Sequence, residues 1–269
     1  MIRKTTMTQT SNENFPSTGL LANKVAFVTG AGRGIGAAAA RLFAGEGASV
    51  VLASRTESEL SAVVEEIRAA GGTGSYVVTD FSNAASVQSA VQTVVDRHGR
   101  LDIAFNNAGI SIPKVPLVDI PENDFDEITA INYKGVWLAL TAEVRAIRAT
   151  SGRGAIVNNS SVGSFKGNPT LGAYGAAKRA VNSLTETSAI EYGPEGIRVN
   201  AVAPGTTMTA MMQRWASQVP TIIEQLNALT PLRRAANPDE IAQAVAWLLS
   251  DRASYIPGVI LRVDGGMQA

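Results

Sequence analysis

Tyr174 and Lys178 stand four residues apart in a segment with helical spacing, so their side chains share one face of the helix. A free tyrosine has a pKa of about 10 and is a poor base at neutral pH. A nearby ammonium group stabilises the phenolate and lowers this pKa, which suits the pair to move a proton to or from an alcohol oxygen. Taken alone, the spacing fits an ordinary amphipathic helix with a surface lysine better than it fits catalysis.

A glycine-rich loop, Thr29–Gly36, follows a short apolar run and opens an alanine-rich helix. Glycines permit a tight turn and let backbone N–H groups approach a pyrophosphate, and the helix N-terminus adds a partial positive charge. Glycine strings also serve ordinary turns, but this one lies in the strand–loop–helix context that dinucleotide binding requires. The loop therefore predicts a dinucleotide site rather than a structural turn.

Short apolar runs rich in β-branched residues alternate with helical patterns, and no linker or internal repeat divides the chain. Such runs, bounded by Gly, Asp or Asn, are typical of buried parallel strands. Their alternation with helices implies right-handed crossovers in a doubly wound α/β sheet. The seven runs are residues 24–29, 49–53, 76–79, 101–105, 155–158, 197–202 and 259–263.

Capping residues indicate where three of the helices start. Thr56 and Glu59 form a capping box before a helix over 57–70, and Ser82 can cap the next helix. The sequence Asn-Pro-Asp-Glu at 237–240 supplies a cap, a proline at the first helical position and a glutamate at the third.

The composition excludes several classes of function. The 269 residues are 45% hydrophobic and 17% charged, which is typical of a globular protein with a large core. Lys plus Arg and Asp plus Glu number 23 each, so the net charge of zero favours neither nucleic acid nor anionic membranes and is compatible with self-association. With no cysteine and one histidine, disulfides, thiolate nucleophiles and histidine-rich metal sites are excluded.

The ends of the sequence bear on domain organisation and location. Residues 1–20 are polar and lack periodicity, so we expect a flexible N-terminal tail before a single domain over 21–269. No run approaches the length of about 18 apolar residues that a membrane helix needs, and no signal peptide is evident. We therefore expect a cytoplasmic protein.

The motifs follow one another in the order found in short-chain dehydrogenases/reductases. They are Thr29-Gly-x-x-x-Gly-x-Gly36, Asn106-Asn-Ala-Gly109, Ser161, Tyr174-x-x-x-Lys178 and Pro204-Gly205. From about Lys24 onward, the chain resembles the compact, non-extended branch of that family. The resemblance implies a single-domain Rossmann fold with a seven-stranded parallel sheet. It also implies an oxidoreductase that transfers hydride between a nicotinamide and a ketone or secondary alcohol.

The same resemblance implies four catalytic residues. Tyr174 is then the general acid or base, and Lys178 also holds the nicotinamide ribose. Ser161 orients the substrate carbonyl, with Ser160 as the competing assignment that the spacing to Tyr174 disfavours. Asn132 helps to hold a proton-relay water next to Lys178, against the alternative of a local backbone hydrogen bond.

A cofactor groove is implied along the carboxyl ends of the strands. In it, Asp80 is expected at the adenine amine, Asn106 beside the adenine ribose and the Ile35 backbone at the pyrophosphate. Asn107 is expected to brace the sheet instead. The full set implied is Gly30, Gly32, Arg33, Gly34, Ile35, Gly36, Ser54, Arg55, Asp80, Phe81, Asn106, Ala108, Gly109, Tyr174, Lys178, Pro204, Gly205, Thr207 and Thr209.

The residues after the second strand favour NADP(H) over NAD(H). NAD-preferring sites normally have a carboxylate there that accepts from the ribose 2′-hydroxyl, but this chain has Ser54. Arg55 follows, and Arg33 lies in the glycine loop, so two guanidiniums can clamp a 2′-phosphate. NAD(H) remains the alternative, with both arginines as solvated surface charges.

A substrate pocket with a lid over about 208–230 is expected beside Tyr174. Its walls are predicted to be Val162, Phe165, Leu171, Met211 and Trp215, which suit a small to medium, largely apolar ketone or alcohol. Reduction of 3-oxoacyl chains on an acidic carrier protein is an alternative, but it needs a basic mouth, and the helix after Tyr174 carries Glu186, Glu191 and Glu195. A catalytically inactive nucleotide sensor is disfavoured by the intact set of catalytic residues.

Self-association is expected as a homotetramer or homodimer. The segments from Asp124 to Thr150 and after Tyr174 hold more apolar residues than one face of a sheet can cover, namely Trp137, Leu138, Leu140, Val181 and Leu184.

Overall fold

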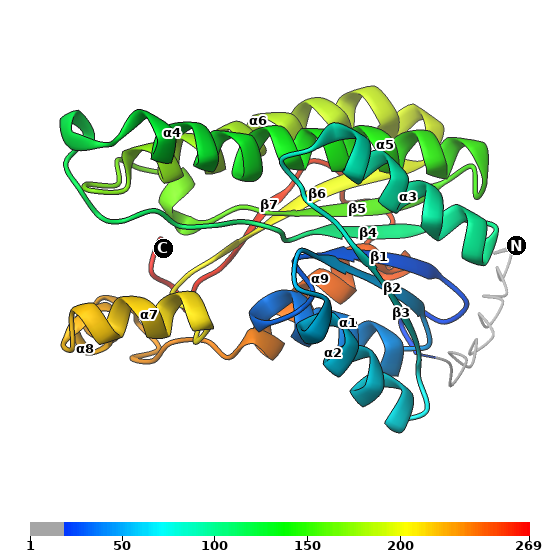
Figure 1. Ribbon diagram of the computed structural model, residues 1–269, viewed down its shortest axis with the longest axis horizontal. Coiled ribbons are helices and arrows are strands. Elements are labelled where there is room, and N and C mark those ends of the chain that lie inside the picture. Colours follow the sequence, from blue (N-terminus) through cyan, green and yellow to red (C-terminus); the bar gives the residue numbers. More distant parts are fainter. Residues whose placement is uncertain (1–18) are drawn as a thin grey trace, which may run out of the picture.

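The seven apolar runs form one parallel sheet in the computed structural model, which describes residues 19–269 (Figure 1). The sheet has the strand order β3-β2-β1-β4-β5-β6-β7, so the chain winds outward from β1 in one direction and from β4 in the other. This is the doubly wound Rossmann arrangement that the sequence predicts. The strands are β1(Val25–Thr29), β2(Ser49–Ser54), β3(Thr73–Val78), β4(Ile103–Asn106), β5(Gly154–Asn159), β6(Ile197–Pro204) and β7(Ile260–Val263).

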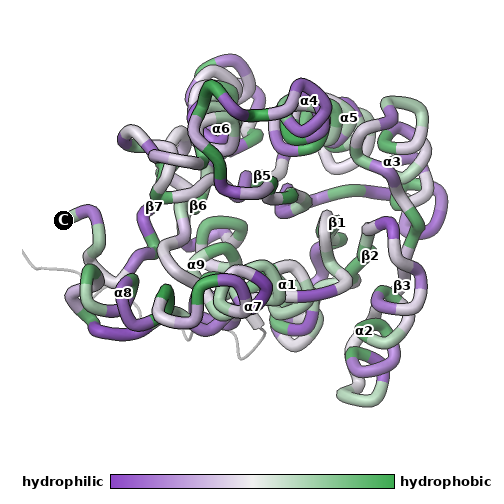
Figure 2. The backbone as a smooth tube through the Cα atoms, turned by 60° about the vertical axis from the view of Figure 1, so that its left-hand side comes forward, coloured by the Kyte–Doolittle hydropathy of each residue, from purple (hydrophilic) through white to green (hydrophobic). Residues whose placement is uncertain are grey.

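Helices cover both faces of the sheet (Figure 1). One layer holds α1(Gly34–Gly45), α2(Glu57–Ala69) and α9(Pro238–Leu249); the other holds α3(Ala84–His98), α4(Glu122–Thr129), α5(Gly135–Ala149) and α6(Gly172–Tyr192). Neighbouring residues of a strand serve opposite layers: Val28 packs with α1 and α9, whereas Phe27 packs with α3 and α5. Both are fully buried, which explains why the strands read as continuous apolar runs. In Figure 2, hydrophobic and hydrophilic residues alternate along the outer helices α2 and α4.

Two short helices extend beyond the carboxyl ends of β6 and β7 (Figure 1). They are α7(Ala210–Gln218) and α8(Ile222–Leu229), and they fall within the segment 208–230 that the sequence predicts as a lid. Single 3₁₀ turns connect other elements: η1(Leu117–Asp119), η3(Val162–Ser164), η4(Gly193–Glu195) and η5(Asp251–Ala253).

The structure corrects the capping interactions predicted for two of the three helices, although α2 does begin at Glu57 as the sequence predicts. Thr56 precedes α2 without a side-chain cap, and Glu59 turns toward the glycine loop instead of closing a capping box. Asn83, not Ser82, caps α3 by accepting from Ser86, while Ser82 donates to Asp80. Helix α9 does begin with its proline at the first position, and the Glu240 carboxylate accepts from the Asn237 N–H at 2.9 Å.

Two boundaries also differ from the sequence prediction. Strand β3 begins at Thr73, three residues before the predicted start, because pairing with β2 recruits the polar residues Thr73-Gly-Ser75. Most of the tail predicted over 1–20 lies outside the described residues. Leu20 lies inside them, and its N–H donates to the Glu46 carboxylate at 2.6 Å.

A π-helical turn, η2(Ala130–Lys134), joins α4 to α5. The sequence predicts an uninterrupted helical stretch here, because an irregularity of five residues is too short to be recognised in the apolar pattern. Such turns insert one extra residue and recur at functional sites. This one carries Asn132, which is fully buried.

A buried polar network connects β4, β5, α5 and α6. The Asn106 amide donates to Glu143 at 2.9 Å and to Asn158 at 3.0 Å, and Asn158 donates to Thr185 at 3.0 Å. Within the described residues, Glu143 Oε1 and Asn106 Oδ1 are both buried without a hydrogen-bond partner. A proton on Glu143 removes the penalty of a buried charge, and burial raises the pKa of Glu143 to about 8.

The network predicts that the free energy of unfolding falls as pH rises from about 4.5 to about 8. In this range the unfolded state has lost the Glu143 proton while the folded state keeps it, so the slope reaches about −1.4 kcal/mol per pH unit from this one group. In Glu143→Gln, the amide satisfies the same partners at every pH, so the decline should be shallower than in the parent. Urea unfolding at pH 5.5 to 8.5 measures both slopes. Equal slopes would show that Glu143 ionises normally in the fold.

Candidate active site

The glycine loop is held against the sheet by one asparagine. Asn107 Nδ2 donates to the carbonyls of Thr29 and Gly30, each at 3.1 Å, and its backbone N–H donates to Thr29 Oγ1 at 2.9 Å. Gly30 has a φ of +63°, and a Cβ on Gly36 would lie 2.3 Å from the Gly30 carbonyl oxygen and 2.5 Å from Asn107 Nδ2. The close packing of loop, helix and asparagine therefore requires glycine, and the predicted bracing role of Asn107 is confirmed.

The N-terminus of α1 offers backbone N–H groups to an anion. No described side chain caps this helix at Arg33, and its first turn, which includes Ile35, contains no acidic residue. The N-termini of α3 and α7, in contrast, are capped by Asn83 and Thr209. Free N–H groups beside a close-packed glycine loop fit the pyrophosphate of a dinucleotide.

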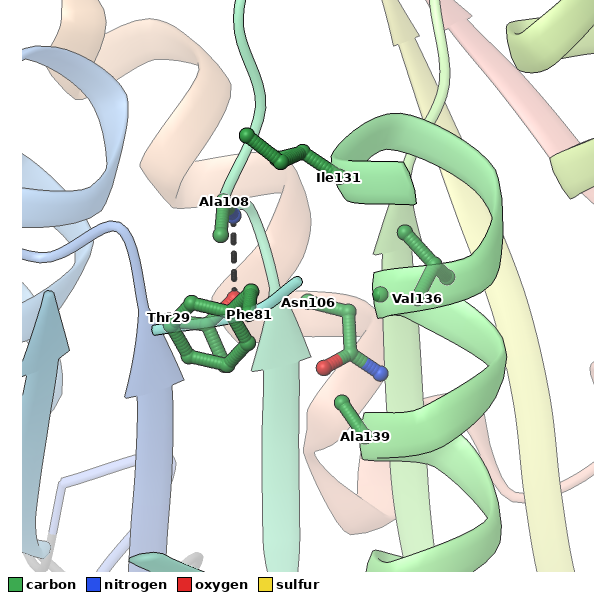
Figure 3. A pocket seen from close by; sticks show the side chains of 8 residues that line it. Thr29, Phe81, Asn106, Ala108, Ile131, Val136 and Ala139 are labelled. Carbon is green, nitrogen blue, oxygen red and sulfur yellow. Dashed lines mark hydrogen bonds between the residues drawn. The ribbon is translucent and has the colours of Figure 1, made fainter. Parts of the chain in front are cut away.

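A narrow pocket lies between β1, β4 and the start of α5, next to the glycine loop (Figure 3). It brings together three predicted cofactor residues, Phe81, Asn106 and Ala108, and the Ala108 N–H donates to Thr29 Oγ1 at 2.9 Å. The Asn106 side chain, predicted beside the adenine ribose, points toward α5 instead, because Glu143 and Asn158 use its amide.

Tyr174 and Ser161 meet at the carboxyl end of β5. Ser161 Oγ accepts from the Gly163 N–H at 3.1 Å, and its hydroxyl lies close enough to the Tyr174 phenol to lower the pKa of that phenol, against the larger effect of burial. Ser160, the competing assignment, is buried, and its hydroxyl contacts Asn182 and the Lys178 carbonyl on α6. The structure therefore places Ser161, not Ser160, where it can share a substrate oxygen with Tyr174.

Lys178 lies below Tyr174 and is 3% exposed. Its Nζ donates to the Asn159 carbonyl at 2.6 Å and lies 5.8 Å from the centre of the Tyr174 ring. Burial lowers the pKa of Lys178 to about 8 and raises that of Tyr174, against which the Ser161 hydroxyl acts. The sequence predicts a lowered phenol pKa, whereas burial raises the pKa of Tyr174 in this structure.

Asn132 makes two hydrogen bonds that neither sequence interpretation describes. Its Oδ1 accepts from the Ile110 N–H and its Nδ2 donates to the Ile110 carbonyl, both at 2.8 Å. These bonds bridge 22 residues, so they are not local. A Cβ placed on Gly109 would lie 3.3 Å from Asn132 Oδ1 and 3.6 Å from Lys178 Nζ, which shows that both groups face the same space.

The predicted substrate residues come from two separate elements. Val162, Phe165 and Leu171 lie between β5 and α6, whereas Met211 and Trp215 lie on α7. Trp215 contacts Lys114, whose ammonium lies over the indole ring at 2.8 Å from its centre, so the loop after β4 touches the lid.

Three further predicted cofactor residues have defined partners. Thr207 is buried and its hydroxyl donates to the Gly205 carbonyl at 3.1 Å. Thr209 caps α7, and its methyl lies 3.3 Å from the position of a Cβ on Gly34, so the lid reaches the glycine loop. Asp80 accepts from the N–H and hydroxyl of Ser82, which hold the pKa of its carboxyl below the usual range.

Sequence reasoning missed two residues of this region. Asn159 donates to Asn107 Oδ1 at 3.0 Å while its carbonyl accepts from Lys178, so it joins the glycine loop to the Tyr174 helix. The sequence shows it only as a polar residue at a strand end. Lys114 lies in an irregular loop, where nothing in the sequence signals its contact with Trp215.

Comparison with known proteins agrees with this geometry. The family model described as enoyl-(acyl carrier protein) reductase matches residues 30–268. A curated relative from Aspergillus oryzae, the short chain dehydrogenase/reductase astE, is 39% identical and covers 92% of this chain and 95% of its own. The chain belongs to the short-chain dehydrogenase/reductase family.

Other members of the family extend the match. The A-factor type gamma-butyrolactone 1'-reductase (1S-forming) of Streptomyces virginiae is 45% identical over 92% of this chain and 96% of its own length. The crystal structure of levodione reductase superposes with a TM-score of 0.88 at 36% identity, covering 91% of this chain and 98% of the other. As a short-chain dehydrogenase/reductase, the protein is an oxidoreductase that acts on alcohol and carbonyl groups of small molecules with a nicotinamide cofactor.

Within residues 19–269, no helix is both long and apolar enough to cross a bilayer, and no cluster of three potential metal ligands occurs.

Proposed function

We propose that the protein is an NADP(H)-dependent oxidoreductase of ketones or secondary alcohols in which Tyr174 is the general acid and base. The observation that supports this most directly is the position of the Tyr174 phenol. It lies beside Ser161, on the same helix as the buried Lys178, and is connected to the glycine loop through Asn159 and Asn107. Proton transfer and dinucleotide binding thus share one edge of the sheet.

The residues divide the chemistry among them. A bound nicotinamide cofactor supplies or accepts the hydride. Tyr174, which burial keeps protonated at neutral pH, donates its proton to the carbonyl oxygen during reduction and takes it back from the alcohol during oxidation. Ser161 Oγ holds the same substrate oxygen. Lys178 holds the cofactor ribose, and Asn132 positions the Ile110 loop beside it.

The residues after β2 support NADP(H) as the cofactor. Ser54 ends the strand without a carboxylate, and the exposed Arg55 makes no ion pair within residues 19–269. A hydroxyl and a free guanidinium accept a 2′-phosphate, whereas a strand-end carboxylate repels it. NAD(H) is the alternative cofactor.

Apolar walls support a small to medium ketone or alcohol as substrate. Met211 and Trp215 supply the lid side, and Ile110 and Tyr174 pack against the same small apolar cluster. The 3-oxoacyl carrier-protein substrate is less well supported, because the exposed carboxylates of Glu186 and Glu191 on α6 repel an acidic partner.

A homotetramer or homodimer is proposed on the exposed apolar residues of α4 and α5. Phe125 is 48% and Trp137 is 46% exposed, and Ile190 on α6 is 78% exposed. Leu140 and Val181, which the sequence assigns to such a surface, are instead in the core.

Replacing Tyr174 by Phe tests the assignment of the proton donor. The ring and its packing remain while the exchangeable proton is lost, so kcat should fall about 100-fold or more. Affinity for NADPH, measured by quenching of tryptophan fluorescence, should stay unchanged. Tyr192→Phe, at the other end of the same helix, is the matched control and should retain activity. Near-parental turnover by Tyr174→Phe would remove Tyr174 from this role.

The cofactor preference is tested by kcat/KM with NADPH and with NADH. The parent should prefer NADPH, and Arg55→Ala should weaken NADPH about tenfold because one charge-assisted bond is lost. Ser54→Asp combined with Arg55→Ala should reverse the preference, since a carboxylate then faces the 2′ position. A parent that prefers NADH, or a double variant with unaltered preference, would contradict the proposal.

Light scattering at micromolar concentration tests the assembly. We expect a mass of two or four 28.1 kDa chains, and Trp137→Lys should shift it toward one, because a charge replaces an apolar contact. A parental mass of a single chain would refute self-association.

A further inference from the structure

Glu59 is an acidic residue in contact with the glycine loop, and the catalytic scheme does not explain its position. It lies in the first turn of α2, where a capping box would turn its carboxylate back to Thr56. Instead its Oε1 lies 3.2 Å from Arg33 Nη1. The Glu59 side chain is 34% exposed and that of Arg33 is 59% exposed, so the pair lies at the surface of the cofactor groove.

The Glu59 carboxylate and the Ser54 hydroxyl lie over the same point of the loop. A Cβ on Gly32 would be 2.9 Å from Glu59 Oε2 and 3.3 Å from Ser54 Oγ. Glu59 therefore supplies a carboxylate beside the end of β2, although the strand itself ends in serine. Arg33, one of the two predicted phosphate ligands, is engaged by it, while Arg55 is not ion-paired within residues 19–269.

We infer that Glu59 is a specificity-determining residue of the cofactor site, which weakens binding of a ribose 2′-phosphate and thereby limits discrimination between NADPH and NADH. The inference rests on the proposed dinucleotide site and not on which cofactor the parent prefers. Glu59 acts in two ways: its charge repels the dianionic phosphate, and its ion pair competes with that phosphate for Arg33. A 2′-hydroxyl lacks the negative charge and is not repelled.

The size of the effect follows from the exposure of the pair. Ion pairs at exposed positions are weak, so Arg33 can exchange Glu59 for a phosphate at small expense. Loss of the carboxylate should thus strengthen phosphate binding by about three- to tenfold. The Glu59 carboxylate therefore weakens binding of the 2′-phosphate without preventing it.

Glu59→Gln tests this with probes that differ by the 2′-phosphate alone. Dissociation constants for NADPH and NADH, and for 2′,5′-ADP and 5′-AMP, are measured by calorimetry on the full chain. NADPH and 2′,5′-ADP, which carry the 2′-phosphate, should bind about three- to tenfold more tightly to the variant than to the parent. NADH and 5′-AMP should bind to the variant as tightly as to the parent or more weakly. Glu66→Gln is the matched control, because Glu66 also lies on α2 and pairs with an arginine, Arg41, and it should leave all four constants unchanged.

Arg33→Ala separates the two contributions. If competition for Arg33 matters, Glu59→Gln should have a smaller effect in the Arg33→Ala background than in the parent. Glu59→Ala repeats the test with a side chain too short to contact Arg33 or the loop, and it should shift the same ratio.

The outcomes distinguish this inference from the proposed function. A parent that prefers NADH contradicts the proposed cofactor, yet Glu59→Gln would still raise the ratio of NADPH to NADH affinity if the inference holds. An unchanged ratio in both Glu59 variants overturns the inference whatever the parent prefers. Equal tightening of all four probes also overturns it, because that pattern reports a general change in the loop.

Discussion

The two hydrogen bonds from the Asn107 amide to the Thr29 and Gly30 carbonyls fix the relation between the sheet and everything bound at its edge. They fasten the glycine loop to the end of β4, and the missing Cβ of Gly36 lets α1 pack directly against the same amide. The other end of that amide accepts from Asn159, whose carbonyl in turn receives the Lys178 ammonium. One side chain thus couples the dinucleotide loop to the Tyr174 helix, and displacing it would leave buried carbonyls without donors.

Burial, rather than charge pairing, sets the protonation of the interior groups. Desolvation raises the pKa of Tyr174 and Glu143 and lowers that of Lys178, so all three move toward their neutral forms. No carboxylate forms an ion pair with Lys178 in the described structure, and its ammonium donates to the Asn159 backbone carbonyl instead. The consequence for chemistry is directional: a phenol that keeps its proton is a ready donor to a carbonyl oxygen, while alcohol oxidation needs the phenolate and is favoured at higher pH.

The sequence predicts the sheet and its seven strands because these rest on local periodicity, and the family resemblance predicts the catalytic set because its motifs have fixed spacing. It fails where a choice depends on residues distant in the chain. Ser82 and Asn83 are equally good caps by type, and the competition is decided by Asp80, which takes Ser82. The π turn at Asn132 spans only five residues, which is too short for the apolar pattern to reveal it. Asn106 was expected to face a ribose, but its buried partner Glu143 lies 37 residues away and directs the amide inward.

The cofactor preference is a further property that the sequence predicts incompletely, because it depends on charges brought together by the fold. A strand-end residue is informative because the backbone fixes it next to the ribose, and Ser54 at the end of β2 argues for a phosphate. Yet the local potential is a sum over every nearby charge, and α2 brings the Glu59 carboxylate to the same point of the loop from five residues further on. That carboxylate was available to sequence reasoning only as a helix cap, a role that the pairing with Arg33 overrides. When a neighbouring carboxylate already neutralises one arginine of a cationic site, the site binds a dianion less strongly than the number of its arginines implies. The identity of the partner of Arg33 therefore matters as much as the presence of Arg33 itself.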